Sequence, residues 1–275
     1  MTGAAAPIGS LRQLAALFSG SPERGLLEAI YAFESELRRI VASPAHEAAH
    51  ARLQWWRGEL DRLAAGRPSH PLGQALLPLR GRRGVDFALL HEMLVAADLD
   101  LARMTYRNWQ ELDAYLLRAS GTPQLLIAAV LAGERGLAPA EREFARRLGA
   151  AVRQVEILFD LQRDLARGRM YAPTEALEAA GVDPVAFSRD WHDAPALRFV
   201  TDWQQRTRRE LDELPSVLAG SPQPSAQRHG LVLAALHARW LDGWTRLVAR
   251  RDAPRPELGP LTRLWTAWRT ALRHP

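Results

Sequence analysis

Apolar side chains recur every three or four residues along most of the chain, which is the spacing of an amphipathic helix. Residues 23–42 are typical, with Leu27, Ile30 and Leu37 among the side chains that share one face. The same reading predicts helices over 11–18, 43–66, 72–79, 86–104, 109–131, 139–171, 174–181, 184–191, 195–218, 226–251 and 258–272. No strand is predicted, because no stretch alternates with a period of two. The fold class that follows is all-α, a single domain in which helix packs on helix.

Small polar residues and prolines mark where these helices begin and bend. Ser43 is predicted to cap a helix that has Pro44 in its first position, and Asn108 is predicted to cap another. Within 109–131, the segment 121–123 (Gly-Thr-Pro) is expected to disturb the helix, because proline cannot donate the i−4 hydrogen bond.

The longest predicted helix carries a pair of carboxylates. Asp160 and Asp164 are four residues apart, so they lie one turn apart on the same side of the helix. Val155, Leu158 and Leu161 make this helix apolar over much of its circumference, which indicates a central position in the fold. Paired carboxylate oxygens suit Mg2+, which completes its shell with water and substrate phosphates. On spacing alone such a pair is more often a solvated helix face, and the apolar setting is what favours a functional one.

The composition is that of an ordinary globular protein, with 47% hydrophobic and 24% charged residues over 275 positions. Cysteine is absent from the sequence, which excludes disulfides and thiolate metal sites. All 36 basic residues are arginine, and the formal net charge is +5. Arginine binds phosphates bidentately, so a phosphate-bearing ligand or an anionic membrane surface stays open, while no nucleic-acid-binding module is recognised. Neither a signal peptide nor a membrane-spanning run is identified, so a cytoplasmic location is expected.

Five stretches of the chain, in this order, resemble the squalene/phytoene synthase family, the head-to-head trans-isoprenyl diphosphate synthases. They lie at residues 29–33, 56–76, 98–115, 148–171 and 173–182. The resemblance covers about residues 11–190, whereas the helices predicted over 195–275 carry no motif that matches. It implies that residues 1–275 form one isoprenoid-synthase-type helical bundle with a central cavity.

The resemblance also implies a chemistry. Active members of the family hold Mg2+ between two aspartate-rich motifs that face each other across the mouth of the cavity. The metal binds the diphosphates of two prenyl chains and assists their departure, because a diphosphate that leaves in an apolar pocket requires concentrated positive charge. Asp160 and Asp164 match the second motif as metal ligands. The candidates for the pocket and for diphosphate contact are Tyr31, Asp100, Tyr106, Gln154, Glu156 and Arg167.

The chain departs from the family pattern at the residues that carry this chemistry. In the second motif, Glu156 stands where asparagine is expected and Phe159 stands where arginine is expected. The first motif is degenerate, with arginine or alanine at its acidic positions and serine where an arginine is usual. It falls on Glu34, Ser35, Arg38, Arg39 and Ala42.

These departures weaken metal binding by electrostatics. A guanidinium at about 4 Å repels Mg2+ by roughly 4 kcal/mol per unit of metal charge at an effective dielectric constant of about 20. Tight binding of several ions is therefore not expected, and Glu34 and Glu36 can replace the lost acids only if the motif shifts its register. We expect Arg38 or Arg39 instead to form an ion pair with Asp160 or Asp164, which would close the site in a metal-free state.

Two functions of different class follow. In the first, the protein has lost metal-dependent prenyl transfer and acts as an isoprenoid-binding or assembly factor, as some relatives do, including a factor for the assembly of respiratory complex I. In the second, it is a Mg2+-dependent prenyltransferase that condenses two farnesyl or geranylgeranyl diphosphates to a squalene- or phytoene-type product. The first is favoured. The expected partners are a prenyl diphosphate or other isoprenoid, a protein, or the surface of the inner membrane, and not nucleic acid.

Two further patterns have an ordinary and a functional interpretation. His46 and His50 are four residues apart, a spacing that can bind zinc, but no third ligand accompanies them and exposed histidines are expected. In the last predicted helix, Trp265 and Trp268 accompany three arginines. Core packing is the expected role of these tryptophans, and contact with a membrane or a partner protein is the alternative.

Overall fold

The computed structural model describes residues 10–19, 23–250 and 257–273, and within these ranges it contains helices and no strand. The predicted all-α fold class is therefore confirmed. The α-helices are α1 (Leu11–Ala16), α2 (Arg24–Val41), α3 (His46–Ala64), α4 (Pro71–Leu76), α5 (Leu89–Leu101), α6 (Trp109–Leu116), α7 (Thr122–Ala132), α8 (Pro139–Ala166), α9 (Thr174–Ala179), α10 (Pro184–Arg189), α11 (Ala194–Val217), α12 (Arg228–Thr245) and α13 (Pro260–Arg273).

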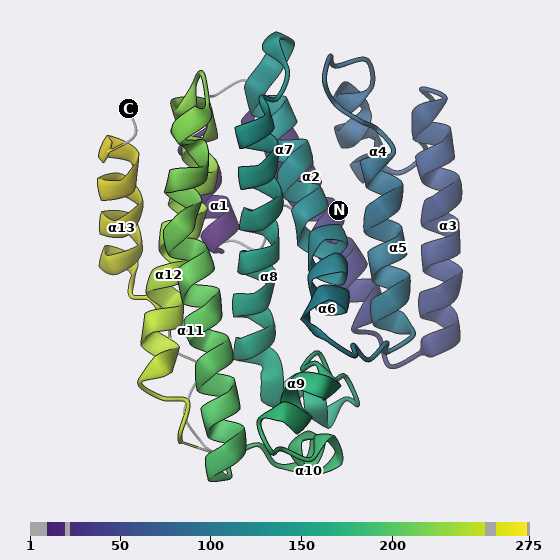
Figure 1. The fold of residues 1–275 in the computed structure, drawn as a ribbon. Helices are drawn as coiled ribbons and strands as arrows, with labels where there is room; N and C mark the ends of the chain where they lie inside the picture. Colours follow the sequence, from purple (N-terminus) through teal and green to yellow (C-terminus); the bar gives the residue numbers. More distant parts are fainter. Residues whose placement is uncertain (1–9, 20–22, 251–256, 274–275) are drawn as a thin grey trace.

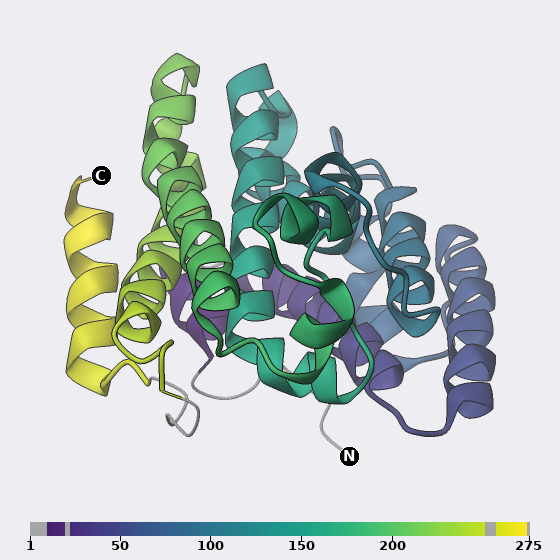
Figure 2. The same cartoon turned by 60° about the horizontal axis from the view of Figure 1, so that its bottom comes forward.

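Helix α8 runs through the middle of the bundle, as the apolar pattern of its sequence predicts (Figure 1). It packs against α11 and α12 on one side and against α6 and α7 on the other. Helices α3, α4 and α5 form one edge of the bundle, and α13 forms the opposite edge beside α12. The short helices α9 and α10 lie together at one end, which comes forward in Figure 2.

The buried apolar side chains form two main clusters. One gathers residues of α8, α11 and α12, including Val155, Trp203 and Leu236. The other gathers residues of α2, α3, α5 and α7, including Ile30 and Leu60. Because α2 and α8 belong to different clusters, polar residues on their facing sides lie at the seam between two apolar cores.

The helix ends follow the predictions in part. The Oδ1 atom of Asn108 accepts from the N–H of Glu111 at 3.0 Å, so the predicted cap is present. A π-helical turn over 117–121 separates α6 from α7, which confirms the expected disturbance. The predicted cap at Ser43 is wrong: α3 begins at His46, and the Ser43 hydroxyl accepts from Ala45 within the turn that joins α2 to α3. Helix α12 ends earlier than predicted, and its predicted end at residue 251 lies outside the described residues.

The π-helical turn is held close to α8 by two glycines. A Cβ atom on Gly149 would lie 2.0 Å from the carbonyl oxygen of Ser120, a distance that no side chain can occupy. A Cβ on Gly121 would in turn lie 3.2 Å from the carbonyl oxygen of Arg146. The two backbones therefore touch, and this contact brings the side chain of Ser120 to the seam between the two cores.

One continuous helical stretch among the described residues, Trp109–Arg135, is long and apolar enough to cross a membrane by length and composition. Of its apolar window, 72% is buried inside the bundle. A core helix passes the same test, so this stretch is weak evidence for a membrane span.

Candidate functional site

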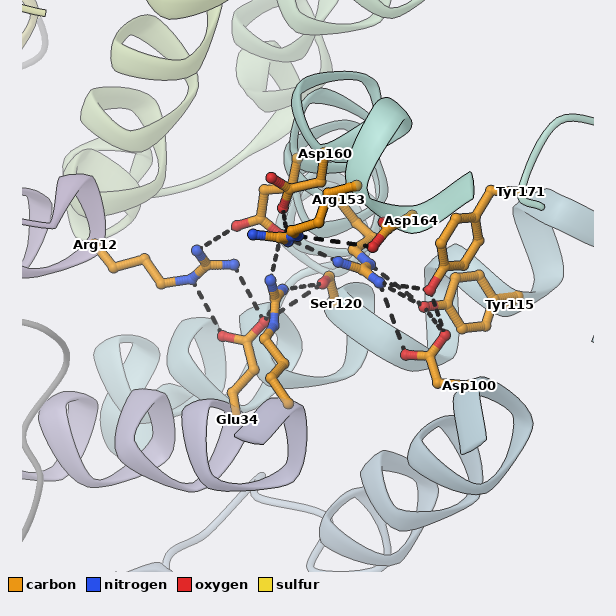
Figure 3. A network of polar contacts seen from close by, with 12 residues as sticks. Arg12, Glu34, Asp100, Tyr115, Ser120, Arg153, Asp160, Asp164 and Tyr171 are labelled. Atoms are coloured by element: carbon orange, nitrogen blue, oxygen red, sulfur yellow. Dashed lines mark hydrogen bonds and ion pairs between the residues drawn. The ribbon is translucent and has the colours of Figure 1, made fainter. Parts of the chain in front are cut away.

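The face of helix α2 that points into the bundle carries a row of polar residues. Tyr31, Glu34 and Arg38 follow at intervals of three and four residues, so they share one face. Tyr31 is fully buried and Glu34 is 4% exposed. A carboxylate buried this deeply is costly unless it is paired. Two arginines pair it, Arg12 of α1 and Arg38 one turn later on α2 (Figure 3).

Arg12 and Arg38 bridge the same two carboxylates, Glu34 of α2 and Glu156 of α8. Nη1 of Arg12 lies 2.5 Å from Oε1 of Glu156, and its Nε lies 3.2 Å from Oε2 of Glu34. Nη1 of Arg38 lies 2.6 Å from Oε2 of Glu156, and its Nη2 lies 2.8 Å from Oε1 of Glu34. Every oxygen of both carboxylates thus faces a guanidinium nitrogen. We call these four residues the central ion cluster.

The central ion cluster favours the charged forms of Glu156 and Arg12. Burial alone would raise the pKa of Glu156, but attraction to Arg12, Arg38 and Arg153 outweighs burial and holds this pKa well below its ordinary value. Burial also disfavours the charged form of Arg12, yet Glu156 and Glu34 hold the pKa of Arg12 above its ordinary value. Removal of one partner would leave a buried charge uncompensated, which costs about 3–5 kcal/mol.

Arg153 connects the central ion cluster to polar groups on α5. Its Nη1 lies 3.8 Å from Oε2 of Glu156, and its Nη2 lies 3.7 Å from Oδ2 of Asp100. The hydroxyls of Tyr115 and Tyr171 donate to Oδ1 of Asp100 at 2.8 and 2.7 Å and accept from Arg153 (Figure 3). Burial raises the pKa of both tyrosines, so they stay protonated donors. Three arginines therefore face three carboxylates along the seam, and their formal charges cancel.

The predicted metal ligands lie beyond Glu156 on α8. Asp160 and Asp164 share one side of the helix, as their spacing predicts (Figure 3). Oδ2 of Asp160 lies 2.5 Å from Nη2 of Arg163, and Oδ1 of Asp164 lies 4.0 Å from Nε of the same arginine. Asp164 is 6% exposed, and burial raises its pKa above the ordinary value. Both aspartates thus lie near the same arginine of their own helix, Arg163.

The predicted ion pair between Arg38 or Arg39 and these aspartates is wrong. Arg38 pairs with Glu156, which lies one turn before Asp160 on α8. Arg39 is exposed and pairs with Glu36 at 2.7 Å. The axial register of α2 against α8 sets Glu156, and not the aspartates, at the level of Arg38. The arginine at a position where the sequence analysis expected an acid therefore binds the glutamate at a position where it expected asparagine.

Two of the predicted tyrosines lie beside the network. The Tyr31 hydroxyl is 3.0 Å from Nε2 of His229 and accepts from Nε2 of Gln124 at 3.2 Å. Burial lowers the pKa of His229 to about 3, so its imidazole is neutral near pH 7. The ring of Tyr106 is buried and stacks on that of Tyr171, with centroids 6.2 Å apart.

Other predicted residues lie away from the network. Gln154 is buried, but it faces α11, where its Oε1 accepts from Nε1 of Trp203 at 3.0 Å. Ser35 is half-buried on α2, while Ala42 and Arg167 are exposed just beyond the ends of α2 and α8. His46 and His50 are exposed, as predicted.

Sequence reasoning missed Arg12, Arg153 and Ser120. Arg153 could have been found, because it lies three residues before Glu156 and seven before Asp160, on the same face of the helix. Ser120 donates to Glu34 and accepts from an arginine, but only the tertiary contact of the π-helical turn brings it there. Arg12 lies on a six-residue helix with no local signal.

Two hollows border the central ion cluster. The one between α2 and α5, lined by Glu34, Asp100 and Arg153, measures about 30 Å³, which accommodates water and not a prenyl chain. The other measures about 330 Å³ and is lined by side chains of α1, α2, α8, α12 and α13, among them Arg12, Trp240 and Arg263.

The residues present do not fit the multi-ion Mg2+ site that the resemblance implies. Within the described ranges, no group of three or more His, Asp or Glu side chains is placed to share a metal ion. The oxygens of Glu34 and Glu156, which face each other across the seam, already contact guanidinium nitrogens at 2.5–3.2 Å. A hard cation would have to displace both arginines.

The squalene/phytoene synthase family matches residues 9–258, a range that includes α11 and α12. Phytoene synthase 3 of Zea mays is 33% identical over 172 residues, which cover 59% of this chain and 39% of that protein. The 15-cis-phytoene synthase of Synechocystis sp. is 30% identical over 175 residues, which cover 60% of this chain and 52% of that protein. The matches thus span about half or less of these relatives.

Solved structures share the fold. A dehydrosqualene synthase in complex with ligand superposes with a TM-score of 0.81 at 16% identity, over 97% of this chain and 92% of that one. The squalene synthase HpnC from Alicyclobacillus acidocaldarius superposes with a TM-score of 0.73 at 20% identity, over 85% of this chain and 87% of that one. The isoprenoid-synthase type of helical bundle is therefore confirmed.

Proposed function

This chain belongs to the squalene/phytoene synthase family, and we propose that it has lost metal-dependent prenyl transfer and acts as an isoprenoid-binding or assembly factor. The observation that carries the proposal is the pairing of Arg38 with Glu156 across α2 and α8. A protein cation takes the carboxylate oxygens at the level where the two motifs of the family face each other.

Electrostatics favour the arginines over a metal at this position. Before Mg2+ could bind Glu34 and Glu156, Arg12 and Arg38 would have to leave both carboxylates. Breaking a buried pair costs about 3–5 kcal/mol. If the arginines stayed, each would repel a divalent ion by roughly 8 kcal/mol at about 4 Å and an effective dielectric constant of about 20. The central ion cluster therefore opposes metal entry whether it opens or remains closed.

The ligand in this proposal is an isoprenoid or a prenyl diphosphate, held without bond cleavage. The hollow of about 330 Å³ next to the central ion cluster offers the guanidinium group of Arg263 for a phosphate and the ring of Trp240 for an apolar chain. A protein partner is the other form that a binding role takes. The location that goes with both is the cytoplasm, in peripheral contact with the inner membrane, where isoprenoids partition.

An active prenyltransferase is the second candidate. It is supported by the retention of Asp160 and Asp164 on one side of α8 and by the identity to phytoene synthases over the motif region. In this case Mg2+ would supply charge to the departing diphosphate, and the central ion cluster would have to rearrange.

Incubation of the purified protein with farnesyl or geranylgeranyl diphosphate and Mg2+ separates the two candidates. We expect no diphosphate release above that of a heat-denatured control. In calorimetry, we expect farnesyl diphosphate to bind equally well with Mg2+ and with a chelator. Mg2+-dependent diphosphate release would overturn the proposal and establish the second candidate.

A charge reversal tests whether Arg38 is what keeps metal out. In Arg38→Asp, the acidic residue that the family pattern expects returns between Glu34 and Glu156, so Mg2+ should raise the melting temperature. Arg39→Asp is the matched control, because it makes the same change at the exposed neighbour, and Mg2+ should leave it unchanged. An equal Mg2+ response of the wild-type protein would contradict the proposed role of Arg38.

A further inference from the structure

Helix α13 presents its apolar face to solvent. It packs on α12 and α1, and Ala267 is its one fully buried side chain among the described residues. The half-buried positions of this helix carry Thr262, Arg263, Thr266, Thr270 and Ala271. The large apolar side chains point the other way, with exposed fractions of 83% for Leu261, 55% for Leu264, 58% for Trp265, 51% for Trp268 and 59% for Leu272. The helix is therefore inverted relative to the usual arrangement, in which the apolar face is covered.

These five side chains form one continuous stripe. Their spacing of three, one, three and four residues places them on a single side of the helix. The rings of Trp265 and Trp268 lie next to each other, with centroids 5.3 Å apart. Isolated exposed apolar residues are normal on a soluble surface, whereas a contiguous patch marks a place of contact. Helix α13 lies at the edge of the bundle in both views, so the stripe is open to a large flat partner (Figures 1 and 2).

A groove continues the stripe toward α11 and α12. It measures about 780 Å³, and its apolar lining includes Leu211, Ala234 and Ala238 as well as Leu261 and Trp265 of the stripe. The apolar surface is thus wider than α13 alone.

The charges around the stripe and groove are predominantly positive. The two aspartates of the groove, Asp212 and Asp242, are both paired with Arg208. Three further arginines line it, Arg239, Arg269 and Arg273, and all three are exposed. Helix α13 itself contains no acidic residue. An apolar stripe with tryptophans, flanked by arginines, fits the interface of a bilayer that carries negative headgroups.

A second copy of the chain fits this surface poorly. In a two-fold antiparallel pair of helices, each flank of one helix faces the equivalent flank of the other. Such a pair would oppose Arg269 and Arg273 to the same residues of the second copy, with no carboxylate on α13 to compensate. Like charges in opposition disfavour an interface.

We propose that α13, with the arginines of the neighbouring groove, binds the surface of an anionic lipid bilayer. The inference shares a membrane location with the proposed function, but it rests on α13 and the neighbouring groove, and it holds for a binding factor and for an active enzyme alike. It extends that proposal by assigning the surface that makes contact and the lipid charge that it selects.

Flotation of the full chain with lipid vesicles tests the proposal. We expect the wild-type protein to float with vesicles that contain phosphatidylglycerol. With vesicles of phosphatidylcholine alone, it should stay in the bottom fraction of the gradient. Added salt should weaken the binding to phosphatidylglycerol. The double variant Trp265→Ser/Trp268→Ser should bind at least about tenfold more weakly, because it removes apolar anchors from the interface. Arg269→Gln/Arg273→Gln should lose the preference for phosphatidylglycerol. Trp55→Ser, at an exposed tryptophan of α3 on the opposite edge, is the matched control and should bind as wild type.

Three outcomes would overturn the proposal. One is a wild-type protein that floats with neither kind of vesicle, and another is tryptophan and arginine variants that bind as wild type. The third is a wild-type dimer in sedimentation that Trp265→Ser/Trp268→Ser converts to a monomer, since the stripe would then bind a second copy. Circular dichroism and the melting temperature verify that each variant is folded. The diphosphate-release assay is independent of these variants, so failure of one proposal leaves the other standing.

Discussion

Helices α2 and α13 are both strongly amphipathic, yet the bundle uses them in opposite ways. In α2 the apolar face is covered so completely that Leu27 and Ile30 are fully buried, and the polar Glu34 is buried with them. In α13 the apolar face is open, and Leu261 is 83% exposed. The pattern in each sequence shows that one face is apolar, but the neighbours that the fold supplies decide whether that face becomes core or contact surface.

The two helices also differ in how they treat charge. Arg38 of α2 is half-buried and binds two buried carboxylates, whose low-dielectric surroundings strengthen the pairs and make an unpaired charge costly. Arg269 and Arg273 of α13 are exposed, and water and salt screen their charges. Substitutions on α2 and its partners should therefore act on stability, and those on α13 on binding.

The largest effect is expected from breaking the central ion cluster. Glu156→Gln should lower the free energy of unfolding by about 3–5 kcal/mol, because Arg12 and Arg38 lose one of the two buried carboxylates that they share. Urea unfolding at neutral pH measures this loss of unfolding free energy. The control is Glu175→Gln, which breaks the exposed pair with Arg107 and should cost no more than about 1 kcal/mol. A loss at Glu156 as small as that of the control would mean that the cluster is solvated.

A matched pair of leucine truncations tests the comparison directly. Leu27→Ala on α2 should cost about 3 kcal/mol, because it leaves a cavity at a fully buried position. Leu264→Ala on α13 should change the free energy of unfolding by no more than about 0.5 kcal/mol, because this side chain is 55% exposed. Equal losses in chemical denaturation would show that something in the protein covers α13.

The close contact of α8 with the π-helical turn should leave no room for a side chain at Gly149. Gly149→Ala should destabilise the protein by about 2 kcal/mol, since its Cβ would lie 2.0 Å from the Ser120 carbonyl oxygen and the backbones must separate. Gly58→Ala on α3 is the control. Its Cβ would meet only the Arg62 side chain at 3.6 Å, and alanine should stabilise this helix by up to about 1 kcal/mol. Relative to the wild-type protein, we expect Gly149→Ala to lower the melting temperature and Gly58→Ala to raise it.

The last prediction concerns pH and His229, which contacts Tyr31 of α2. His229 has a pKa of about 3 in the folded protein against an ordinary value of 6.5. Below pH 6.5 the unfolded chain binds a proton that the folded protein does not, so stability falls with pH by about 1.4 kcal/mol per unit toward pH 3. His237, whose pKa is lowered to about 4, adds to this slope. His229→Gln should reduce the slope of unfolding free energy between pH 6.5 and pH 5, whereas substitution of the exposed His46 should not. A slope unaffected by His229→Gln would mean that this histidine titrates normally.

The sequence by itself determined the helices and the central place of α8. Helical periodicity is a local property, so the apolar faces of α2 and α8 and the common side of Asp160 and Asp164 could be read from spacing alone. The ordered motifs carried the family and the fold. The existence of an apolar stripe in the last helix was equally local.

The tertiary structure alone decided the partners. Arg38 and Glu156 are 118 positions apart, and which carboxylate of α8 faces Arg38 depends on how far one helix slides along the other. The entry of Arg12 into the cluster depends on where a six-residue helix docks, which its own sequence does not determine. The side on which α13 packs is likewise set by α12, so only the fold turned its tryptophans outward. Local periodicity fixes directions within a helix, and ion pairs and docking surfaces depend on the positions of helices relative to one another.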